Sequence, residues 1–389
     1  MSNKLEPIAR QLSIRAVIDA FLQHGAITRT QLAEQTGLSK QTMSEVVREL
    51  EANGWLRVGG TAAGSVGRRA VIYEFEETAC YVVGVDLGGS NMRAAIATLN
   101  GNIVAETSEV TDSRGGRFVV EQVGSVVDRL ILASGVERSR IDSGAIAVSG
   151  VVQRSTGAVM VAQNIRGISD MNFIGAMEER LRMPVLVENA VDMATKGELW
   201  RGGGKGIDNF VFIGHGAGIG LGAVLEGRLL KGRKGAIGEI CFLPIGGDPY
   251  DPRELAAGRF EAAVGAAGMV RRYEAYGGAT GATVRDIFAA LGQQSAAAEA
   301  VIDETARLVA LAVASALAVL DPDLVVMGGN IGIQPEMVRR VNGYLARCTP
   351  LQTRLEASAL GARAQLIGAV KAAMECAYDK LFGVRSSVP

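Results

Sequence analysis

The chain has 389 residues, a formal net charge of −1 and nearly half apolar residues, so about two or three folded domains are expected. Its apolar runs are interrupted well before the ~18 residues that a membrane-spanning helix needs, and the N-terminus lacks an apolar signal segment. Near-neutral charge gives no general attraction to nucleic acid or membranes. The sequence therefore predicts a cytoplasmic protein with no membrane partner, in which any DNA contact comes from a local surface.

The start of the chain predicts a small helical module. A stripe of apolar residues with helical period indicates a first helix ending near His24. Thr28 and Gln31 have capping-box spacing, and Ser39 can cap a further helix after a turn at Gly37. Two short helices joined by a glycine turn predict a helix-turn-helix, whose second helix enters a major groove. Five polar residues near the start of that helix are candidates to contact bases and phosphates: Ser39, Lys40, Gln41, Thr42 and Ser44.

Two short strands around a glycine-rich loop follow and predict a wing. Arg68 and Arg69 in that loop suit a phosphate track or a minor groove. Residues 1–78 carry equal numbers of basic and acidic side chains, so DNA binding is expected to depend on dimerisation and local placement. A helical interaction domain without DNA contact is the alternative, and the wing favours the DNA-binding interpretation.

The remaining chain contains a duplicated strand pattern. The segment "YVVGVDLGGSNMRAAIATLNGNIV" has glycines between two apolar runs and the hairpin signal Asn100-Gly101, so its glycine turn joins two antiparallel strands. Residues 208–230 repeat the pattern of residues 82–104, which predicts two similar lobes facing a cleft. Further short strands, a long buried helix before Asp321, and a strand from Leu324 to Met327 followed by a loop predict an α/β body.

These residues resemble the ROK family of repressors, open reading frames and sugar kinases, in its repressor-type branch. The resemblance is carried by "DLGGSNMRAAIATLNG", "NIRG", "PVLVENAVDMATKGELWRGGGKG", "GAGIGLGAVLEGRLLKGRKGAIGEI" and "DLVVMGGNI", in family order behind the winged module. It implies an N-terminal winged helix-turn-helix followed by a two-lobed, actin-like and hexokinase-like body of the ribonuclease H type. The expected division is residues 1–78, a first lobe at 79–195 completed by a C-terminal helix at about 365–389, and a second lobe at 196–364 with the ligand cleft and the oligomer contacts.

The resemblance implies two phosphate-binding turns, which we expect to be vestigial here. In the family kinases the first turn holds nucleotide phosphate, and its aspartate helps to place the metal. The second turn has alanine where threonine is usual, so a phosphate contact is lost, and in a non-kinase the first glycines can serve the hairpin alone. The matching residues are Asp86, Gly88, Gly89 and Ser90 in the first turn, and Gly216 and Gly218 in the second.

Ala190 occupies the position of the family's catalytic aspartate. In the kinases that aspartate takes the proton from the attacking sugar hydroxyl, and a general base is central to such chemistry. Asp192 lies two residues further along a helix, about 200° around its axis, so its carboxylate is expected to point away from the cleft. No catalytic residue is therefore expected, and the protein is predicted not to be an enzyme.

The family's zinc segment is also altered, and no metal or other cofactor is expected. The histidine that binds zinc and sugar in the family is Phe242 here, and the cysteine cluster is absent. The polar groups that remain suit hydroxyl recognition. They are the candidate sugar ligands Asn164, Asn189, Glu239 and Glu254, the last of which aligns with the acidic residue that closes the zinc segment.

The sequence thus predicts a DNA-binding transcriptional repressor whose kinase-like body senses a sugar or sugar derivative without phosphorylating it. Its expected partners are operator DNA, a sugar-like effector, and further copies of the chain in a homodimer or homotetramer. An ATP-dependent sugar kinase with an added DNA-binding module is the alternative. A third possibility is a regulator that has lost its ligand and only dimerises.

Overall fold

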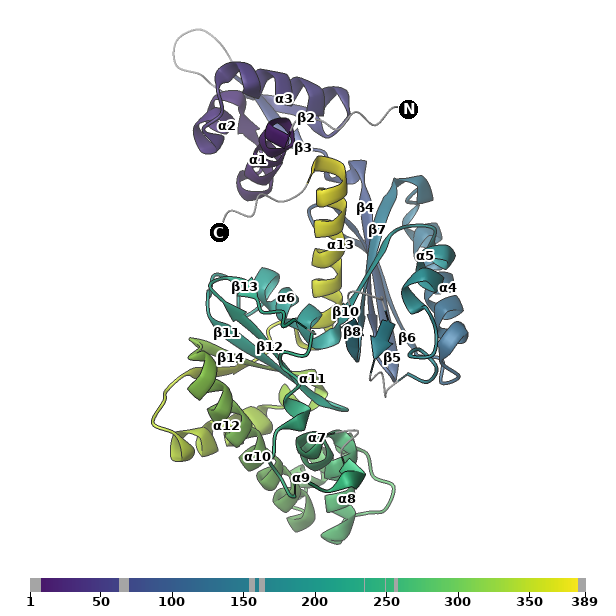
Figure 1. Cartoon of the computed structure of the whole chain (residues 1–389), viewed down its shortest axis with the longest axis vertical. Coiled ribbons are helices and arrows are strands. Elements are labelled where there is room, and N and C mark those ends of the chain that lie inside the picture. Colours follow the sequence, from purple (N-terminus) through teal and green to yellow (C-terminus); the bar gives the residue numbers. More distant parts are fainter. Residues whose placement is uncertain are drawn as a thin grey trace.

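The computed structural model describes residues 8–62, 70–153, 158–160, 165–233, 235–248, 250–254 and 258–383. It has a small N-terminal unit and two lobes, with one long helix running between the unit and the lobes (Figure 1). Within those residues, no helix is both long and apolar enough to cross a membrane.

The N-terminal unit is a winged helix-turn-helix, as predicted. Thr28 and Gln31 form the capping box of its second helix, and the Ser39 hydroxyl caps the third by accepting a hydrogen bond from the Thr42 backbone N–H at 3.1 Å. The strands form a small antiparallel sheet in the order β1-β3-β2, in which β2 and β3 make the wing. The elements are α1 Ile8–His24, β1 Ile27–Thr28, α2 Arg29–Thr36, α3 Lys40–Ala52, β2 Leu56–Ala62 and β3 Ala70–Phe75.

The two lobes repeat one sheet topology, which confirms the duplication seen in the sequence. In each sheet the first three strands are antiparallel, and two later strands are added in parallel on the other side of the first. The order is β10-β7-β4-β5-β6 in the first sheet and β13-β12-β11-β14-β15 in the second. The first sheet comprises β4 Tyr81–Leu87, β5 Asn91–Thr98, β6 Ile103–Val110, β7 Ile141–Val148 and β10 Val185–Asn189. The second comprises β11 Phe210–His215, β12 Ile219–Leu225, β13 Arg228–Leu229, β14 Leu324–Gly328 and β15 Arg354–Ala357.

Helices cover both faces of the first sheet. α4 (Gly116–Ser134) and α5 (Phe173–Leu181) pack on one face, whereas α13 (Ala364–Phe382) packs on the other. α13 also packs against α6 (Ala190–Arg201) so closely that their backbones are in contact at Gly368. A Cβ atom at Gly368 would come within 1.6 Å of the Met193 carbonyl oxygen. The hairpin β8 (Val151–Gln153) and β9 (Ala158–Met160) extends from this lobe.

The second lobe buries its apolar core between its sheet and a helical layer. Its helices are α7 Arg259–Val264, α8 Ala266–Ala275, α9 Val284–Gly292, α10 Ala296–Leu320, α11 Gly329–Gly332 and α12 Pro335–Cys348. Short 3₁₀ turns occur at η1 Glu77–Ala79, η2 Arg138–Arg140, η3 Ile240–Phe242, η4 Pro252–Glu254 and η5 Gly361–Arg363.

Two details differ from the sequence expectations. The segment after β14 was expected to be a loop, but Gly329 adopts a positive φ of 76° and starts the short helix α11. The expected boundary between the lobes at residues 195 and 196 falls inside α6, which continues to Arg201. The chain therefore passes between the lobes through a helix rather than through a linker.

The winged unit shares a hydrophobic core with α13. Apolar residues of α1 and α3 belong to the same buried cluster as the last turns of α13. The rings of Trp55 and Phe382 meet edge to face at 4.9 Å. The Arg15 guanidinium lies 5.3 Å from the centre of the Tyr378 ring and 3.3 Å from a carboxylate oxygen of Asp379. The winged unit is thus packed onto the body.

Candidate functional site

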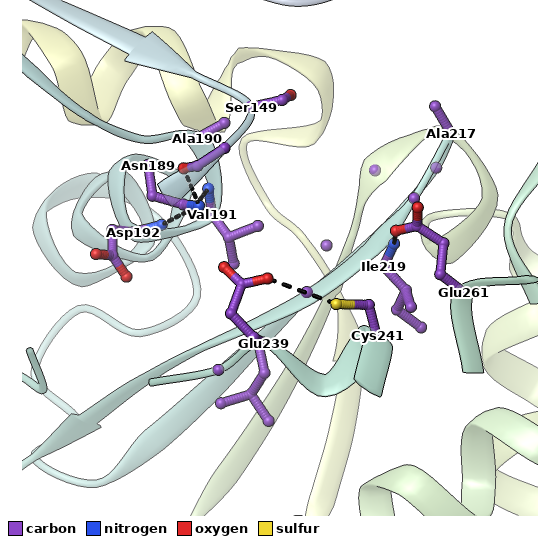
Figure 2. Close-up of a pocket in the computed structure, with 18 of the residues that line it drawn as sticks. Ser149, Asn189, Ala190, Val191, Asp192, Ala217, Ile219, Glu239, Cys241 and Glu261 are labelled. Atoms are coloured by element: carbon purple, nitrogen blue, oxygen red, sulfur yellow. Dashed lines mark hydrogen bonds between the residues drawn. The ribbon is translucent and has the colours of Figure 1, made fainter. Parts of the chain in front are cut away.

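A cavity of about 250 Å³ lies where the N-terminus of α6 approaches the second glycine turn. Figure 2 shows the start of α6 on one side, with β12 and the segment of Glu239 and Cys241 on the other. Its described lining residues are Ser149, Gly150, Asn189, Ala190, Val191, Asp192, Gly214, Gly216, Ala217, Gly218, Ile219, Gly220, Leu221, Gly235, Ile237, Gly238, Glu239, Cys241, Phe242, Glu261, Gly329, Asn330 and Gln365. We call this the first cavity.

Asn189 shapes the wall of the first cavity by capping α6. Its side-chain oxygen accepts hydrogen bonds from the backbone N–H groups of Val191 at 2.7 Å and Asp192 at 3.4 Å. Its amide nitrogen donates to the Gly150 carbonyl at 2.9 Å. Ala190 is the first residue of α6. At this position, where the resemblance places a catalytic aspartate in the kinases, the chain carries only a methyl group.

Asp192 lies at the wall between two cavities, and Figure 2 shows its carboxylate directed away from Glu239 and Ile219. It lines the first cavity and also a neighbouring one. Asn189 ends the strand and α6 begins at the next residue, so Asp192 is in the first helical turn. Side chains on a helix lean toward its N-terminus, which here faces the cavities. Burial raises the pKa of Asp192 to about 6, opposed by the charge of Lys231.

Glu239 extends toward α6 from the opposite side of the first cavity (Figure 2). Burial raises the pKa of its carboxyl group, and the Cys241 thiol opposes this shift by donating a hydrogen bond to it at 3.5 Å. Phe242 also lines this cavity and is 50% exposed. An aromatic ring with a free face beside carboxylates suits a ligand with both apolar and hydroxyl-bearing surfaces.

Glu261 is a cavity residue that the sequence did not single out. It lies in the first turn of α7, and its carboxylate accepts a hydrogen bond from the Ile219 backbone N–H at 3.0 Å. It therefore holds α7 against the second glycine turn, where a Cβ at Gly218 would lie 2.3 Å from this carboxylate. Burial raises the pKa of Glu261, and the nearby charge of Glu239 adds to the shift. The available signal was an acidic residue three positions after Gly258, a glycine that precedes the apolar residues of α7.

The two glycine turns do not share the first cavity. Gly216 and Gly218 line it, whereas Asp86 and the turn at residues 88–90 are absent from its described wall. Asp86 is paired across the hairpin with Arg93, whose guanidinium donates to its carboxylate at 3.2 Å. Burial raises the pKa of Asp86 to about 6 even though Arg93 acts in the opposite direction. A role of either turn in phosphate binding remains a prediction.

Several predicted residues lie outside the described structure. Asn164, Arg68 and Arg69 are not among the described residues. The backbone of Glu254 ends η4, but its side chain is likewise not described. Their assigned roles remain predictions.

The candidate DNA-contacting residues gather at the start of α3. Ser39, Lys40 and Gln41 are exposed there, while Thr42 and Ser44 are half-buried. Part of their hydrogen-bonding capacity is used locally, since the Ser44 hydroxyl donates to the Lys40 carbonyl at 2.8 Å and the Gln41 amide donates to Glu45 at 3.2 Å. Lys40 and Gln41 are the exposed candidates within α3, and their contact with DNA stays a prediction.

The model of the ROK family matches residues 82–375, which include both sheets and the first cavity. The chain belongs to the ROK family. A second family model, described as MarR family, matches residues 16–69 and so covers the winged unit. The ROK body therefore follows a DNA-binding domain of MarR type.

ROK relatives of this chain include both kinases and repressors. It is 29% identical over 271 residues to a glucokinase of Halalkalibacterium halodurans, a match that covers 64% of this chain and 80% of that enzyme. It is 22% identical over 335 residues to the N-acetylglucosamine repressor of Escherichia coli O157:H7, covering 83% of this chain and 82% of the repressor. The repressor match extends further along this chain than the kinase match.

The fold is also that of a ROK regulator. The crystal structure of a ROK family transcriptional regulator, a homologue of the E. coli Mlc protein, superposes with a TM-score of 0.78. It covers 97% of this chain and 98% of that chain at 22% sequence identity. At this level of identity the likeness establishes the fold alone. The superposed region includes the winged unit as well as the two lobes.

Within the described ranges, no group of three or more His, Cys, Asp or Glu side chains is arranged to hold a metal ion. Cys241 is buried, and burial raises the pKa of its thiol to about 12, so this thiol is neutral at physiological pH.

Proposed function

We propose that this protein is a transcriptional repressor that binds operator DNA through its winged unit and binds a sugar-like effector in the first cavity. The supporting observation is the composition of the cavity wall: Asn189 and Glu239 remain, whereas Ala190 replaces the catalytic aspartate of the family kinases. Glu261 joins them as a further candidate ligand. The carboxylates can accept hydrogen bonds from sugar hydroxyls, and the second N–H of the Asn189 amide can donate to a hydroxyl oxygen, so such a wall binds a sugar without activating it.

Phosphorylation of the effector is not expected. A γ-phosphoryl transfer needs a base aimed at the attacking hydroxyl. Asp192 is the neighbouring carboxylate, but it lies two residues along α6 and beside Lys231 in the adjoining cavity. A coupled assay with ATP and a sugar panel is expected to show no turnover above background. Turnover that is lost in Asp192→Asn and Asp86→Ala would instead support the kinase alternative.

α6 and α13 offer a route from the cavity to the winged unit. Ala190 at the start of α6 and Gln365 at the start of α13 both line the first cavity. The two helices touch at Gly368, and the far end of α13 carries Phe382 into the winged unit. An effector can shift these helices only if it binds one conformation of the cavity more tightly than another. In an oligomer, a small tilt of α13 would change the spacing of the paired α3 helices, whose half-sites lie about 34 Å apart.

The test is operator binding by the full chain with and without sugars. Fluorescence anisotropy on the promoter DNA of its own gene neighbourhood is expected to show nanomolar binding that changes about tenfold or more with one sugar. Glu239→Gln should abolish the sugar response and leave operator affinity in the absence of sugar unchanged. Intact operator binding with no response to any sugar would favour a regulator that has lost its ligand. Absence of operator binding would contradict the regulatory role itself.

A further inference from the structure

A second cavity adjoins the first on the far side of the α6 N-terminus. Its volume is about 540 Å³, and it lies between β10, α5 and the segment that follows β13. The two cavities share four lining residues, two from the start of α6 and two from that segment: Asn189, Asp192, Gly235 and Ile237. The cavities are therefore neighbours that meet at one set of residues.

The volumes indicate which ligand each cavity can hold. The first, at about 250 Å³, is smaller than the roughly 300–1,000 Å³ that small-molecule sites usually enclose, and suits one sugar ring. The second cavity, at about 540 Å³, falls inside that range without counting the first. A single ring bound to Glu239 and Glu261 would leave the second cavity in contact with water, whereas a longer ligand would fill both.

The chemistry of the second cavity suits another sugar ring. One part of its wall is apolar and includes Ile174, Leu186 and Leu230. Another part carries an ion pair in which the Lys231 ammonium donates to the Glu188 carboxylate. Apolar side chains beside fixed charged donors and acceptors complement a ring that has C–H faces and hydroxyl edges.

The same charges disfavour a phosphorylated monosaccharide. Lys231 is already paired with Glu188, and the Asp192 carboxylate lies beside the same ammonium. A phosphate placed there would face two carboxylates and share one cation with them, and like charges at such distances repel. Arg233 also lines this cavity and, like Lys231, is exposed, so the high dielectric of water weakens the attraction of either cation for a phosphate.

We propose that the effector spans both cavities and is a disaccharide or other glycoside, with its glycosidic bond passing between Asn189 and Ile237. One ring binds in the first cavity beside Glu239, and the second ring binds between Leu230 and the Glu188–Lys231 pair. This inference rests on the proposed effector site and specifies the length of its ligand.

The test compares matched monosaccharides and disaccharides on the full-length protein by isothermal titration calorimetry. The probes are glucose against cellobiose and N-acetylglucosamine against N,N′-diacetylchitobiose, with the two 6-phosphates of the monosaccharides as anionic probes. At least one disaccharide is expected to bind about tenfold or more tightly than its own monosaccharide. Equal affinities within both pairs, or tightest binding of a 6-phosphate, would overturn the proposal while leaving a sugar-sensing site in place.

Variants locate the second ring. Leu230→Trp fills the second cavity and Lys231→Ala removes its ammonium, so each should weaken disaccharide binding by about fivefold or more and leave monosaccharide binding within about twofold. Glu239→Gln should weaken both, and Lys205→Ala, an exposed cation outside both described walls, should weaken neither. A disaccharide advantage that survives both Leu230→Trp and Lys231→Ala would refute the placement. Failure of every sugar to bind would refute the proposed effector site together with this inference.

Discussion

At the scale of single residues, the first cavity concentrates carboxyl groups whose ionisation is opposed by burial. Asp192, Glu239 and Glu261 line it, and burial raises the pKa of each. No lysine, arginine or histidine belongs to its described wall. Because burial already keeps water away from these carboxyl groups, accepting hydrogen bonds from an incoming ligand costs them little further hydration. The site therefore favours hydroxyl-rich ligands over anions.

The pKa of Asp192 predicts a pH-dependent stability. Its pKa is about 6 in the folded protein against 3.8 for the free side chain, so the folded state favours the protonated form. Its contribution to the free energy of unfolding is thus most favourable below pH 4, declines as the pH rises from 4 to 6, and is constant above. Asp192→Asn should raise the free energy of unfolding at pH 7.5 by about 1–3 kcal/mol and change it little at pH 4.

Urea unfolding at the two pH values measures this difference. Asp170→Asn, at an exposed aspartate, serves as the control and should have almost no effect at either pH. Equal effects of Asp192→Asn at pH 4 and pH 7.5 would show that the Asp192 carboxyl is not held in a buried environment.

At the scale of elements, α13 connects the first cavity to the winged unit. Its start contributes Gln365 to the first cavity, and its end carries Phe382, 4% exposed, into the core of the winged unit. Figure 1 shows it alongside the first sheet, with one end at the winged unit and the other near α6. A 19-residue helix is about 28 Å long, so a single element reaches from the first cavity to the winged unit.

Phe382→Ala is expected to separate effector binding from operator binding. Removing a buried phenylalanine costs about 3–5 kcal/mol, and here the loss falls on the junction with Trp55. The variant should still bind sugar, yet the sugar-induced change in operator affinity should fall to less than about twofold. Phe288→Ala, at a partly buried ring in the second lobe, controls for lost stability alone. An unaltered sugar response in Phe382→Ala would exclude α13 as the connection.

Gly368 makes a second prediction about α13. Its Cβ would come within 1.6 Å of the Met193 carbonyl oxygen, so Gly368→Ala must move α13 away from α6. We expect it to lower the free energy of unfolding by about 2 kcal/mol or more. Gly343→Ala in α12 meets no atom within 4 Å and should raise that free energy by up to about 1 kcal/mol. Thermal denaturation of the two variants measures the contrast, and equal shifts would contradict the close helix contact.

Local patterns predicted most elements, whereas contacts between distant segments could not be read from the sequence. The cap at Ser39 and the repeated strands depend on neighbouring residues, and both were predicted correctly. The position of Asp192 beside Lys231 at a second cavity was missed because Lys231 lies far from it in the sequence. Glu261 was missed because its role depends on the turn at Ile219, which lies far away in the sequence.

At the scale of the whole molecule, DNA binding must come from placement rather than from overall charge. The chain has a net charge of −1, so no general attraction draws it to DNA. Two α3 helices positioned by an oligomer would supply what one winged unit lacks. Because binding would depend on the spacing of the two α3 helices, a ligand that changes this spacing would change the affinity for DNA.

The salt dependence of operator binding tests the wing and α3 separately. Arg68→Ala and Arg69→Ala are expected to weaken binding to all sequences about equally and to reduce the slope of log affinity against log salt by about one each. Gln41→Ala should instead change the preference among operator variants by about 1–3 kcal/mol. Lys205→Ala, on the body, is the matched control for loss of a cation. Unchanged operator affinity in all three DNA-surface variants would refute the assigned interface.

The shared core between the winged unit and α13 limits how freely such regulators can be recombined. Chimeras that graft the first 78 residues onto another effector-binding body would leave the contact faces of Trp55 and Arg15 against unfamiliar side chains. To transfer the winged unit to another protein with its core intact, two separate segments must therefore be moved: the winged unit and the last turns of α13. Biosensors built from this scaffold should exchange both together, and natural exchange of DNA-binding specificity should leave matched changes in both segments.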